Sequence, residues 1–393
     1  MKGPKSLPQD GTLKNMRYTS RRLTMVVLAF GLTLATEGRS AETKVEVVNE
    51  LDMARKAETV ELHWEEFQRP HELFPEHLLV RDARTGQEVA PQVMGDKLIF
   101  QADFAPKERK RFVVVEGKPV NAESKVFGRF VPERLDDFAW ENDKIAFRMY
   151  GPAIEKVEPP SGSGIDVWCK STSRLVINDW YKRDDYHVDH GEGLDCYKVG
   201  PDRGCGGIAI WKDGKLYTSR DFRQWKLLAN GPVRVMFELT YAPWDAGGAK
   251  VGEVKRVSLD AGSRFNRLES IFKFDGADRM MVGVGLNEHT NFSPFSSPRD
   301  GWMGVWDEAD RPKGLTNGMN GVGVVFPPGA GLEFKEAENQ LWFLTTVKAG
   351  EPLVYYAGAG WSKGGFPEMG DWETCVANFA RRIRSPLKVH IQP

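Results

Sequence analysis

Short apolar runs separated by turn residues are the feature that most limits how this chain can fold. The runs alternate apolar with polar side chains and are bounded by Gly, Pro, Asn or Asp. Forty glycines and 23 prolines are spread along the 393 residues, and helix interiors tolerate neither residue well. The pattern predicts an all-β protein of antiparallel strands joined by tight turns.

The first group of predicted strands indicates a small N-terminal β-barrel or sandwich. These strands span residues 45–49, 60–64, 77–82, 97–100 and 111–116. Prolines and polar residues without a clear period follow and predict a linker. The predicted organisation is therefore an export signal at 1–41, an N-terminal β domain at 42–117, a linker at 118–132 and a large catalytic domain at 133–393.

The second group of strands indicates a large antiparallel sandwich, since no fixed repeat suggests a propeller. One helix is predicted at Asp371–Arg384, where apolar side chains recur every three to four residues. Pro386 ends this helix and a final strand is predicted at 387–391. The other predicted strands span 139–141, 145–150, 165–169, 175–177, 208–211, 216–218, 225–229, 233–242, 254–260, 267–274, 280–287, 323–326, 341–347 and 353–357.

Residues 16–41 are typical of an export signal. A basic stretch ending at Arg21 and Arg22 precedes the apolar run Leu23–Ala35, which is short for a membrane span. General secretion is favoured over the twin-arginine route, because Thr24 stands where that signal has a bulky apolar residue. The mature protein is expected to be periplasmic or secreted, without membrane insertion.

Charge and cysteine content exclude some classes of partner. The net charge is -1 and the basic residues are dispersed, which argues against a nucleic-acid partner. The four cysteines lack paired CxxC spacing, which argues against structural zinc. Cys196 and Cys205 could form a disulfide in an oxidising compartment, although sequence spacing alone does not establish the geometry.

One polar segment stands out from this β-rich background. Residues 180–196 (WYKRDDYHVDHGEGLDC) contain two histidines, five carboxylates, two tyrosines and two basic side chains. We predict a loop here, since the segment has little apolar repetition. Titratable residues at this density on a loop suit acid/base chemistry or cation binding. A second polar group with His289 and Arg299 is expected in a loop at 288–320.

These residues suit β-elimination beside a sugar carboxylate, which requires a base, an acid and a neutralising cation. His187 and His190 are the base and acid candidates, and Tyr197 is an alternative acid. The predicted catalytic residues are His187, His190, Tyr197, Tyr186 and Arg299. The predicted substrate-binding residues, with the tryptophans as stacking surfaces for sugar rings, are Arg183, Trp180, Asp189, Glu192, His289, Trp302, Trp361 and Lys363.

Two other functions remain open from the residues alone. The first is a glycoside hydrolase that uses Glu192 with Asp189 or Asp195 as paired carboxylates. The second is a carbohydrate-binding protein without activity. No metal ligands are assigned, but a divalent cation held by the acidic side chains stays open as a cofactor, although the regular calcium-loop spacing is absent.

Four motifs also resemble a bacterial protein family. They are YHVDHGEGLDCYKVG at 186–200, WENDKIAFRMYGP at 140–152, GAGWSK at 358–363 and PLKV at 386–389. They resemble the family catalogued as domain of unknown function 4861, over nearly the whole mature chain. The resemblance implies a galactose-mutarotase-like supersandwich behind a small β-barrel, and a relation to ulvan oligosaccharide dehydratases. We therefore expect a secreted dehydratase or lyase whose partner is an acidic, uronate-containing oligosaccharide.

Overall fold

The computed structural model describes residues 42–67, 77–118, 122–157, 161–289, 291–310 and 316–392. Ser40–Pro393 form one compact unit. The predicted export signal at 1–41 lies outside the described residues. Within the described ranges, no helix has both the length and the apolar character needed to cross a membrane.

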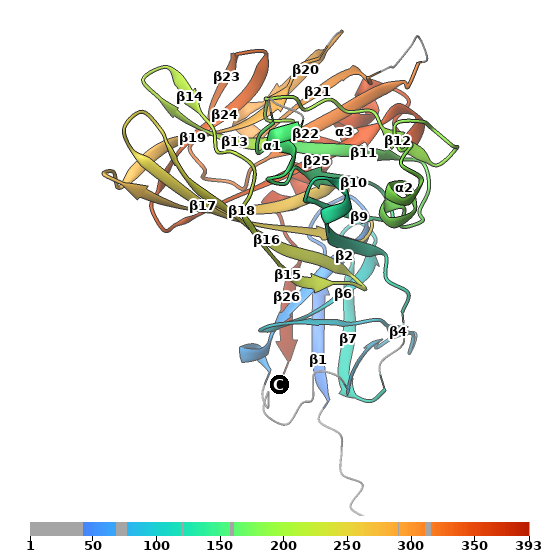
Figure 1. Cartoon of the computed structure of the whole chain (residues 1–393). Coiled ribbons are helices and arrows are strands. Elements are labelled where there is room, and N and C mark those ends of the chain that lie inside the picture. The colour runs from blue at the N-terminus through green and yellow to red at the C-terminus, as the bar shows by residue number, and fades with distance from the viewer. Residues whose placement is uncertain are drawn as a thin grey trace, which may run out of the picture. The chain divides into compact units, whose positions relative to one another are not determined.

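A small β module contains both the first and the last described strands (Figure 1). Its two sheets are antiparallel and share one apolar core. The last strand pairs with the first, which confirms the final strand predicted at 387–391. One sheet has the order β26 (Lys388–Gln392), β1 (Thr43–Val48), β7 (Arg109–Glu116), β3 (Leu78–Asp82), β4 (Glu88–Val89), and the other has β2 (Arg55–His63), β6 (Lys97–Phe104), β5 (Gln92–Met94).

Three further antiparallel sheets form the large supersandwich, as predicted. The widest has the order β15 (Gln224–Asn230), β16 (Arg234–Asp245), β17 (Lys250–Asp260), β18 (Phe265–Asp275), β25 (Pro352–Trp361), β22 (Met319–Val325), β21 (Trp302–Glu308), β20 (Ser293–Ser297). The second has β14 (Lys215–Tyr217), β13 (Cys205–Lys212), β19 (Arg279–Asn287), β24 (Gln340–Lys348), β23 (Glu333–Ala337). The third, which carries the candidate site, has β12 (Gly193–Asp195), β11 (Ile165–Lys170), β10 (Ala146–Met149), β9 (Asp137–Asn142), β8 (Val126–Val131).

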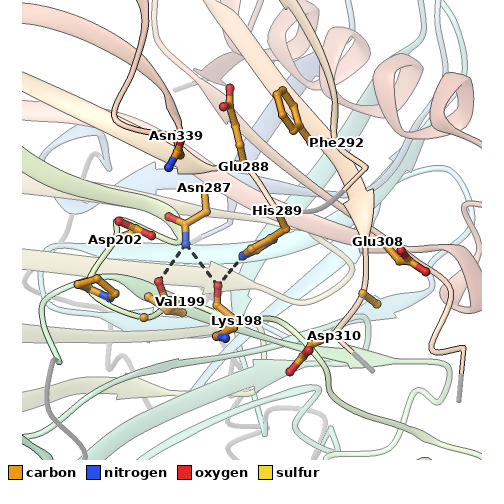
Figure 2. Close-up of a pocket in the computed structure, with 13 residues that line it drawn as sticks. Lys198, Val199, Asp202, Asn287, Glu288, His289, Phe292, Glu308, Asp310 and Asn339 are labelled. Atoms are coloured by element: carbon orange, nitrogen blue, oxygen red, sulfur yellow. Dashed lines mark hydrogen bonds between the residues drawn. The ribbon is translucent and has the colours of Figure 1, made fainter. Parts of the chain in front are cut away.

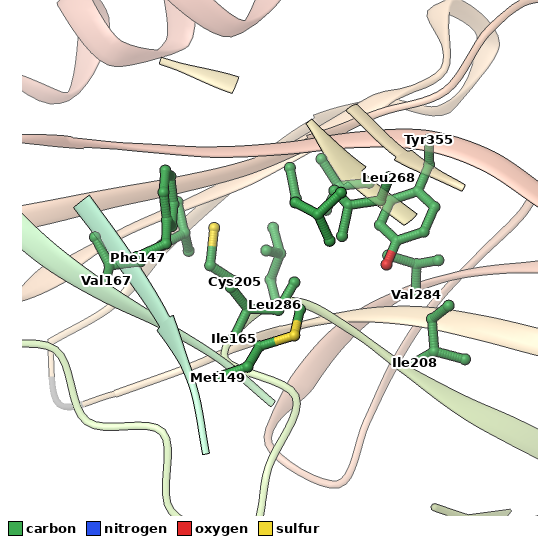
Figure 3. Packing of buried hydrophobic residues seen from close by; sticks show 14 of the residues in the cluster. Phe147, Met149, Ile165, Val167, Cys205, Ile208, Leu268, Val284, Leu286 and Tyr355 are labelled. Atoms are coloured by element: carbon green, nitrogen blue, oxygen red, sulfur yellow. The ribbon is translucent and has the colours of Figure 1, made fainter. Parts of the chain in front are cut away.

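One apolar core joins the three sheets of the supersandwich. Phe147 of the third sheet, Leu286 of the second and Leu268 of the first belong to the same buried cluster (Figure 3). Full burial of a side chain of this size contributes about 1.5–3 kcal/mol to stability. The shared core therefore fixes the third sheet against the other two, and with it the residues that the third sheet presents.

Three helices accompany the sheets: α1 (Ile154–Val157), α2 (Ile177–Arg183) and α3 (Met369–Arg384). Helix α3 confirms the prediction at 371–384. Its buried face includes Trp372, Val376 and Phe379, and it packs against β21 and β22. Short 3₁₀ turns occur at η1 (Trp64–Glu66), η4 (Pro132–Arg134), η5 (Pro298–Asp300) and η7 (Ser362–Gly364).

Several local predictions were wrong. The strand predicted at 175–177 is instead the entry to α2, which also extends into the expected loop at 180–196. The expected linker at 118–132 contains β8, which pairs with β9. The expected loop at 288–320 contains β20 and β21, which pair with each other. In each case a tertiary or cross-strand contact decides the structure, while the local sequence pattern is weak. The domain boundaries stay a prediction.

Candidate active site

A buried ion pair holds the start of α2 and so positions the polar segment. Lys170 Nζ lies 2.6 Å from Glu141 Oε2, and neither side chain is exposed. The Glu141 carboxylate also accepts the backbone N–H groups of Val176 and Ile177, at 2.9 and 2.8 Å. The same carboxylate therefore satisfies Lys170 and caps the first turn of the helix.

A single arginine on β10, Arg148, gathers three buried aspartates. Its Nε and Nη2 donate to Asp166 Oδ2 at 2.9 and 2.6 Å, and Nη2 also donates to Asp195 Oδ2 at 2.9 Å. Asp137 Oδ2 lies 3.6 Å from Nη1. The sheet register explains the cluster, because Arg148 stands directly opposite Asp166 on β11. None of the four side chains is more than 4% exposed.

Burial makes these carboxylates hold their protons unusually tightly. Burial, aided by the charge of Asp195, raises the pKa of Asp166 to about 7. Burial raises the pKa of Asp137 and of Asp195 to about 6, against the attraction of Arg148. The pKa values of these three carboxyl groups are therefore raised well above that of an exposed aspartate.

One N–H group of Arg148 has no acceptor. Nη1 is buried and has no hydrogen-bond partner among the described residues. An unmade hydrogen bond at a buried donor costs about 1–3 kcal/mol, so such a group in a native fold calls for an explanation. Arg148 lines a cavity of about 220 Å³, the small cavity. A ligand with an anionic oxygen in this cavity would supply the missing acceptor.

The small cavity combines cations with proton donors and acceptors. Arg134 supplies a second guanidinium. Burial raises the pKa of Tyr150 well above its ordinary value, which keeps its phenol protonated as a donor. The side chain of His187 is 59% exposed and faces the same space. The lining residues are Arg134, Arg148, Tyr150, His187, Asp195, Cys196, Tyr197, Lys198, Val199, Gly200 and Asp310.

The backbone fixes the tautomer of His187. Its Nδ1 lies 3.1 Å from the backbone oxygen of Asp195, which can only accept a hydrogen bond. Nδ1 therefore carries the hydrogen, and Nε2 of the neutral ring keeps a free lone pair. The ring also packs against Tyr186 at 4.7 Å between centroids. His187 is thus oriented as a base at the wall of the small cavity.

Tyr186 positions the cation and the base without facing the cavity itself. Its hydroxyl accepts a hydrogen bond from Arg134 Nε at 2.8 Å, and its ring stacks on Trp168 at 5.0 Å. The side chain is buried and lines neither the small cavity nor the larger one beside it. The catalytic role predicted for Tyr186 therefore becomes a positioning role.

A large cavity of about 660 Å³ adjoins the small one and shares four residues with it: Lys198, Val199, Gly200 and Asp310. His289 lies at its wall, with Nε2 2.6 Å from the Lys198 backbone oxygen (Figure 2). Its Nδ1 lies 2.7 Å from Asp307 Oδ2. The Lys198 carbonyl can only accept, so Nε2 carries a hydrogen, and an ionised Asp307 accepts a second one from Nδ1. Burial opposes a positive charge on the ring, but the hydrogen bond and charge of Asp307 outweigh it and raise the pKa of His289. Asp307 therefore favours the imidazolium form of His289, although burial also raises the pKa of Asp307 itself.

The two predicted histidines of the polar segment are separated by the structure. His187 lines the small cavity, whereas His190 lines neither cavity and bonds to Asp185 Oδ2 at 2.7 Å. Tyr197 lines the small cavity, but its hydroxyl is buried and has no hydrogen-bond partner among the described residues. The predicted pairing of His187 with His190 as base and acid is therefore not supported by their positions.

The predicted sugar-stacking tryptophans belong to the core. Trp180, Trp302 and Trp361 are 2%, 8% and 1% exposed. Trp180 stacks on Trp168, and the Trp361 indole donates to the Asn317 backbone oxygen. Rings covered in this way offer no face to a sugar, so this prediction was wrong.

The remaining predicted residues lie away from the cavities. Glu192 bonds Arg174 Nε at 2.8 Å and lies 3.8 Å from Arg183 Nη2. Asp189 accepts two backbone N–H groups within its own loop. Arg299 is exposed in η5, and Lys363 donates to the Thr316 backbone oxygen. None of these predicted residues lines either cavity.

The four cysteines are free thiols. Cys205 donates to the Gly358 backbone oxygen at 3.3 Å. Cys196 instead lies near Cys169, since both thiols approach Asn320 Oδ1, at 3.8 and 3.1 Å. The bridge considered between Cys196 and Cys205 is absent.

The described residues also contain no group of three or more His, Cys, Asp or Glu arranged to hold a metal ion.

Sequence reasoning missed Arg134, Arg148 and Tyr150. A signal for Arg148 was available, because an arginine within the apolar strand Ala146–Met149 must be paired if it is buried. Phe292 of the large cavity was also missed, and nothing in its surroundings marks it. Arg134 ends the 3₁₀ turn η4, which gives no local indication of a cavity.

The acidic cluster predicts an unusual dependence of stability on pH. The folded-state pKa of Asp166, about 7, lies above its ordinary value of 3.8, so the folded protein binds more protons between these values. The free energy of unfolding should therefore fall as pH rises through this window, by up to about 4 kcal/mol from Asp166. Urea unfolding across this window measures the fall. Asp166→Asn, which cannot ionise, should remove the share of Asp166 and leave the share of Asp137 and Asp195. Stability that rises with pH across this window in the natural chain would contradict the raised pKa values.

The chain is similar to known proteins over nearly its whole length. The family described as "Domain of unknown function (DUF4861)" matches residues 47–389. "Uncharacterized protein P7" of Formosa agariphila is 34% identical over 383 residues, which cover 88% of this chain and 93% of that protein.

Among solved structures, an α-mannosidase from Enterococcus faecalis V583 has a TM-score of 0.50 and 9% identity, and covers 90% of this chain and 46% of its own. A glycosyl hydrolase family 38 protein from Enterococcus faecalis has a TM-score of 0.49 and 10% identity, and covers 90% of this chain and 47% of its own. This chain thus spans less than half the length of either structure. The likeness to the α-mannosidase concerns the fold alone.

Proposed function

The chain belongs to the family described as domain of unknown function DUF4861, and we propose that it is a carbohydrate-active enzyme that performs β-elimination on uronic-acid-containing oligosaccharides. One observation carries the proposal. A buried guanidinium, Arg148, whose Nη1 has no hydrogen-bond partner among the described residues, lines a cavity that also contains His187 and Tyr150. A cation, a base and an acid are what this reaction requires.

The cation accounts for the preference for a sugar carboxylate. Removal of the proton next to a carboxylate places negative charge on its oxygens, and a fixed guanidinium stabilises that charge. Arg148 is held on two other nitrogens by Asp166 and Asp195, so it need not reorganise during the reaction. Arg134 adds a second positive charge in the same cavity.

The proposed step is a single elimination across two carbons of the sugar ring. His187 Nε2 takes the proton from the carbon that bears the carboxylate, and the released electron pair forms the carbon–carbon double bond. The carbon–oxygen bond at the neighbouring carbon breaks with its electron pair on oxygen, and that oxygen takes the proton of Tyr150. The products are an unsaturated uronate and either water, for a dehydratase, or a shortened sugar chain, for a lyase.

Other parts of the proposal rest on the sequence or on similarity. The signal-like residues 16–41 support a periplasmic or secreted enzyme. The likeness in fold to an α-mannosidase supports a sugar substrate, and the resemblance to ulvan oligosaccharide dehydratases makes a terminal uronate the first substrate to test. A divalent cation also stays part of the proposal as an optional aid to substrate binding.

Incubation of the full chain with uronate-terminated oligosaccharides tests the proposal. We expect ultraviolet absorbance of the conjugated unsaturated uronate to rise, because elimination creates that chromophore. The mass separates the two outcomes, since a dehydratase removes one water from an intact chain whereas a lyase shortens it. The same incubation in the presence of a chelator tests whether the reaction requires a divalent cation. Sugar binding without any new product would favour a non-catalytic binding protein and contradict the proposal.

A glycoside hydrolase is the second candidate, with a different carboxylate pair from the one the sequence suggested. The large cavity is lined by Asp202 and Glu288, and burial raises the pKa of both carboxyl groups. Carboxyl groups with raised pKa values can act as general acids in sugar hydrolysis. New reducing ends without ultraviolet absorbance would favour this candidate.

A further inference from the structure

Two buried thiols lie on one face of the third sheet. Cys169 belongs to β11, and its register partner on β12 is Leu194. Side chains two residues apart on a strand share a face, so Cys196, which directly follows β12, continues the face of Leu194. Cys169 and Cys196 are therefore diagonal neighbours across the two strands. All three side chains belong to the same apolar core.

The contacts of these two thiols bring their sulfur atoms together. Cys169 Sγ lies 3.1 Å from Asn320 Oδ1, and Cys196 Sγ lies 3.8 Å from the same oxygen. A hydrogen bond with the Cys169 thiol, together with burial, raises the pKa of Cys196 well above its ordinary value. Thiols that share an acceptor and bond each other already place their sulfur atoms side by side, as a disulfide requires.

The other two thiols lie in other parts of the core. Cys205 is on β13 of the second sheet, and its thiol donates to the Gly358 backbone oxygen at 3.3 Å. Cys375 is on α3 and packs against a different apolar cluster. The geometry therefore favours Cys169 with Cys196 as the pair that can be joined.

The paired cysteines stand at the two ends of the segment that supplies the base. Residues 170–195 run between them and include α2 and His187. The backbone oxygen that holds His187 Nδ1 belongs to Asp195, the residue immediately before Cys196. The Asp195 carboxylate also accepts a hydrogen bond from Arg148. A covalent bond at Cys196 would therefore tie the surroundings of the base to β11.

We propose that Cys169 and Cys196 form a disulfide that fixes both ends of the segment carrying His187. The oxidant is another disulfide, either of low molecular weight or on a protein. The thiolate of one cysteine attacks it, forms a mixed disulfide and releases one thiol. The second cysteine then attacks the mixed disulfide and releases the other thiol. Two electrons pass to the oxidant, and the two protons end on the released thiols.

Burial affects when this bond can form. The structure shows both cysteines as free, buried thiols. Because a buried thiol yields little of the reactive thiolate, exchange is fastest while the chain folds and the thiols are still open to solvent. The same burial would protect the finished bond from reductants.

Peptide mapping of the full chain tests the bridge. One sample is unfolded in urea and refolded in a buffer of glutathione disulfide and glutathione, and a second sample is kept folded in the same buffer. The remaining thiols are alkylated in denaturant, and the digest is analysed by mass spectrometry without reduction. We expect the peptides of Cys169 and Cys196 to be joined, with Cys205 and Cys375 alkylated.

The bridge should also raise the midpoint of thermal unfolding. The bonded chain is expected to unfold on the order of 5 °C higher than the same chain after reduction, because closing the loop restricts the unfolded state. Cys196→Ala should abolish both the bridge and this difference. Two matched controls should keep both: Cys205→Ala, in the same core cluster, and Cys375→Ala, at a half-buried position of α3.

Alkylation of both Cys169 and Cys196 in the two samples would overturn the proposal, as would a bridge from either of them to Cys205 or Cys375. An unchanged thermal midpoint in the bonded chain would overturn the stabilising role of the bond. None of these measurements needs a substrate. A chain that forms the bridge but no unsaturated uronate would therefore keep this inference and overturn the elimination.

Discussion

Replacement of His187 by alanine is expected to lower kcat for elimination by about 10²–10⁴-fold, which is the usual contribution of a general base. The backbone oxygen of Asp195 fixes the hydrogen on Nδ1 and leaves Nε2 as the proton acceptor of a residue that lines the small cavity. Alanine removes that acceptor. The variant should fold normally, because the His187 side chain is 59% exposed. Initial rates of unsaturated uronate formation measure the loss.

His190→Ala provides the contrast within the same segment. His190 is three residues away and comparably exposed, but it bonds Asp185 and lines neither cavity. We expect it to retain most of kcat. Equal losses in the two variants would show that the loop as a whole matters rather than the imidazole at the cavity, and would contradict the assignment of His187.

Arg148→Lys is expected to lower kcat by about 10²–10³-fold, the range seen when one preorganised donor to a developing anion is removed. Lysine keeps the positive charge but lacks the planar guanidinium of arginine. In Arg148 that group bonds Asp166 and Asp195 through other nitrogens, and its Nη1 remains free to bond the substrate carboxylate. The substrate carboxylate would then lose its fixed partner. Arg148→Ala is less informative, since three buried carboxylates without their cation would cost about 3–5 kcal/mol of stability.

The matched control is Arg234→Lys. Arg234 is also a mostly buried arginine, with Asp260 and Glu61 as its partners, and it lines neither the small nor the large cavity. The Arg234→Lys variant should have a lower free energy of unfolding, measured with urea, without a comparable loss of kcat. An activity loss in Arg148→Lys no greater than in Arg234→Lys would assign Arg148 a structural role only.

The architecture was largely predictable because strand alternation and turn chemistry are local signals. The hairpin between β13 and β14 turns at Asp213 and Gly214, whose φ values are 52° and 72°, as the sequence suggested. Helix α3 was also predictable, because its apolar face follows the helical period. The all-β class and the single long C-terminal helix are therefore properties of local sequence.

The third sheet was less predictable, because distant contacts determine its edges. Helix α2 begins where Glu141, more than thirty positions earlier in the chain, caps it. Strand β8 exists because β9 pairs with it, and its own residues lie in a stretch without a clear period. Short-range patterns do not contain such information.

The site was predictable only in part. The polar segment contains His187 and Tyr186, and both belong to the surroundings of the small cavity. The cation was sought in exposed arginines such as Arg299, whereas the structure brings Arg148 to the cavity from a buried strand. The sequence shows which residues are titratable. It does not show which of them are buried, and burial determines their pKa values and which of their hydrogen bonds stay unmade.

The most direct test of the central claim follows the proton itself. An oligosaccharide whose terminal uronate carries deuterium on the carbon next to the carboxylate is incubated with the full chain, and the product is analysed by mass spectrometry. We predict a slowed reaction and a product that has lost the deuterium together with water or the leaving sugar. A product that retains the deuterium, whether shortened or not, would contradict removal of that proton and the role proposed for His187.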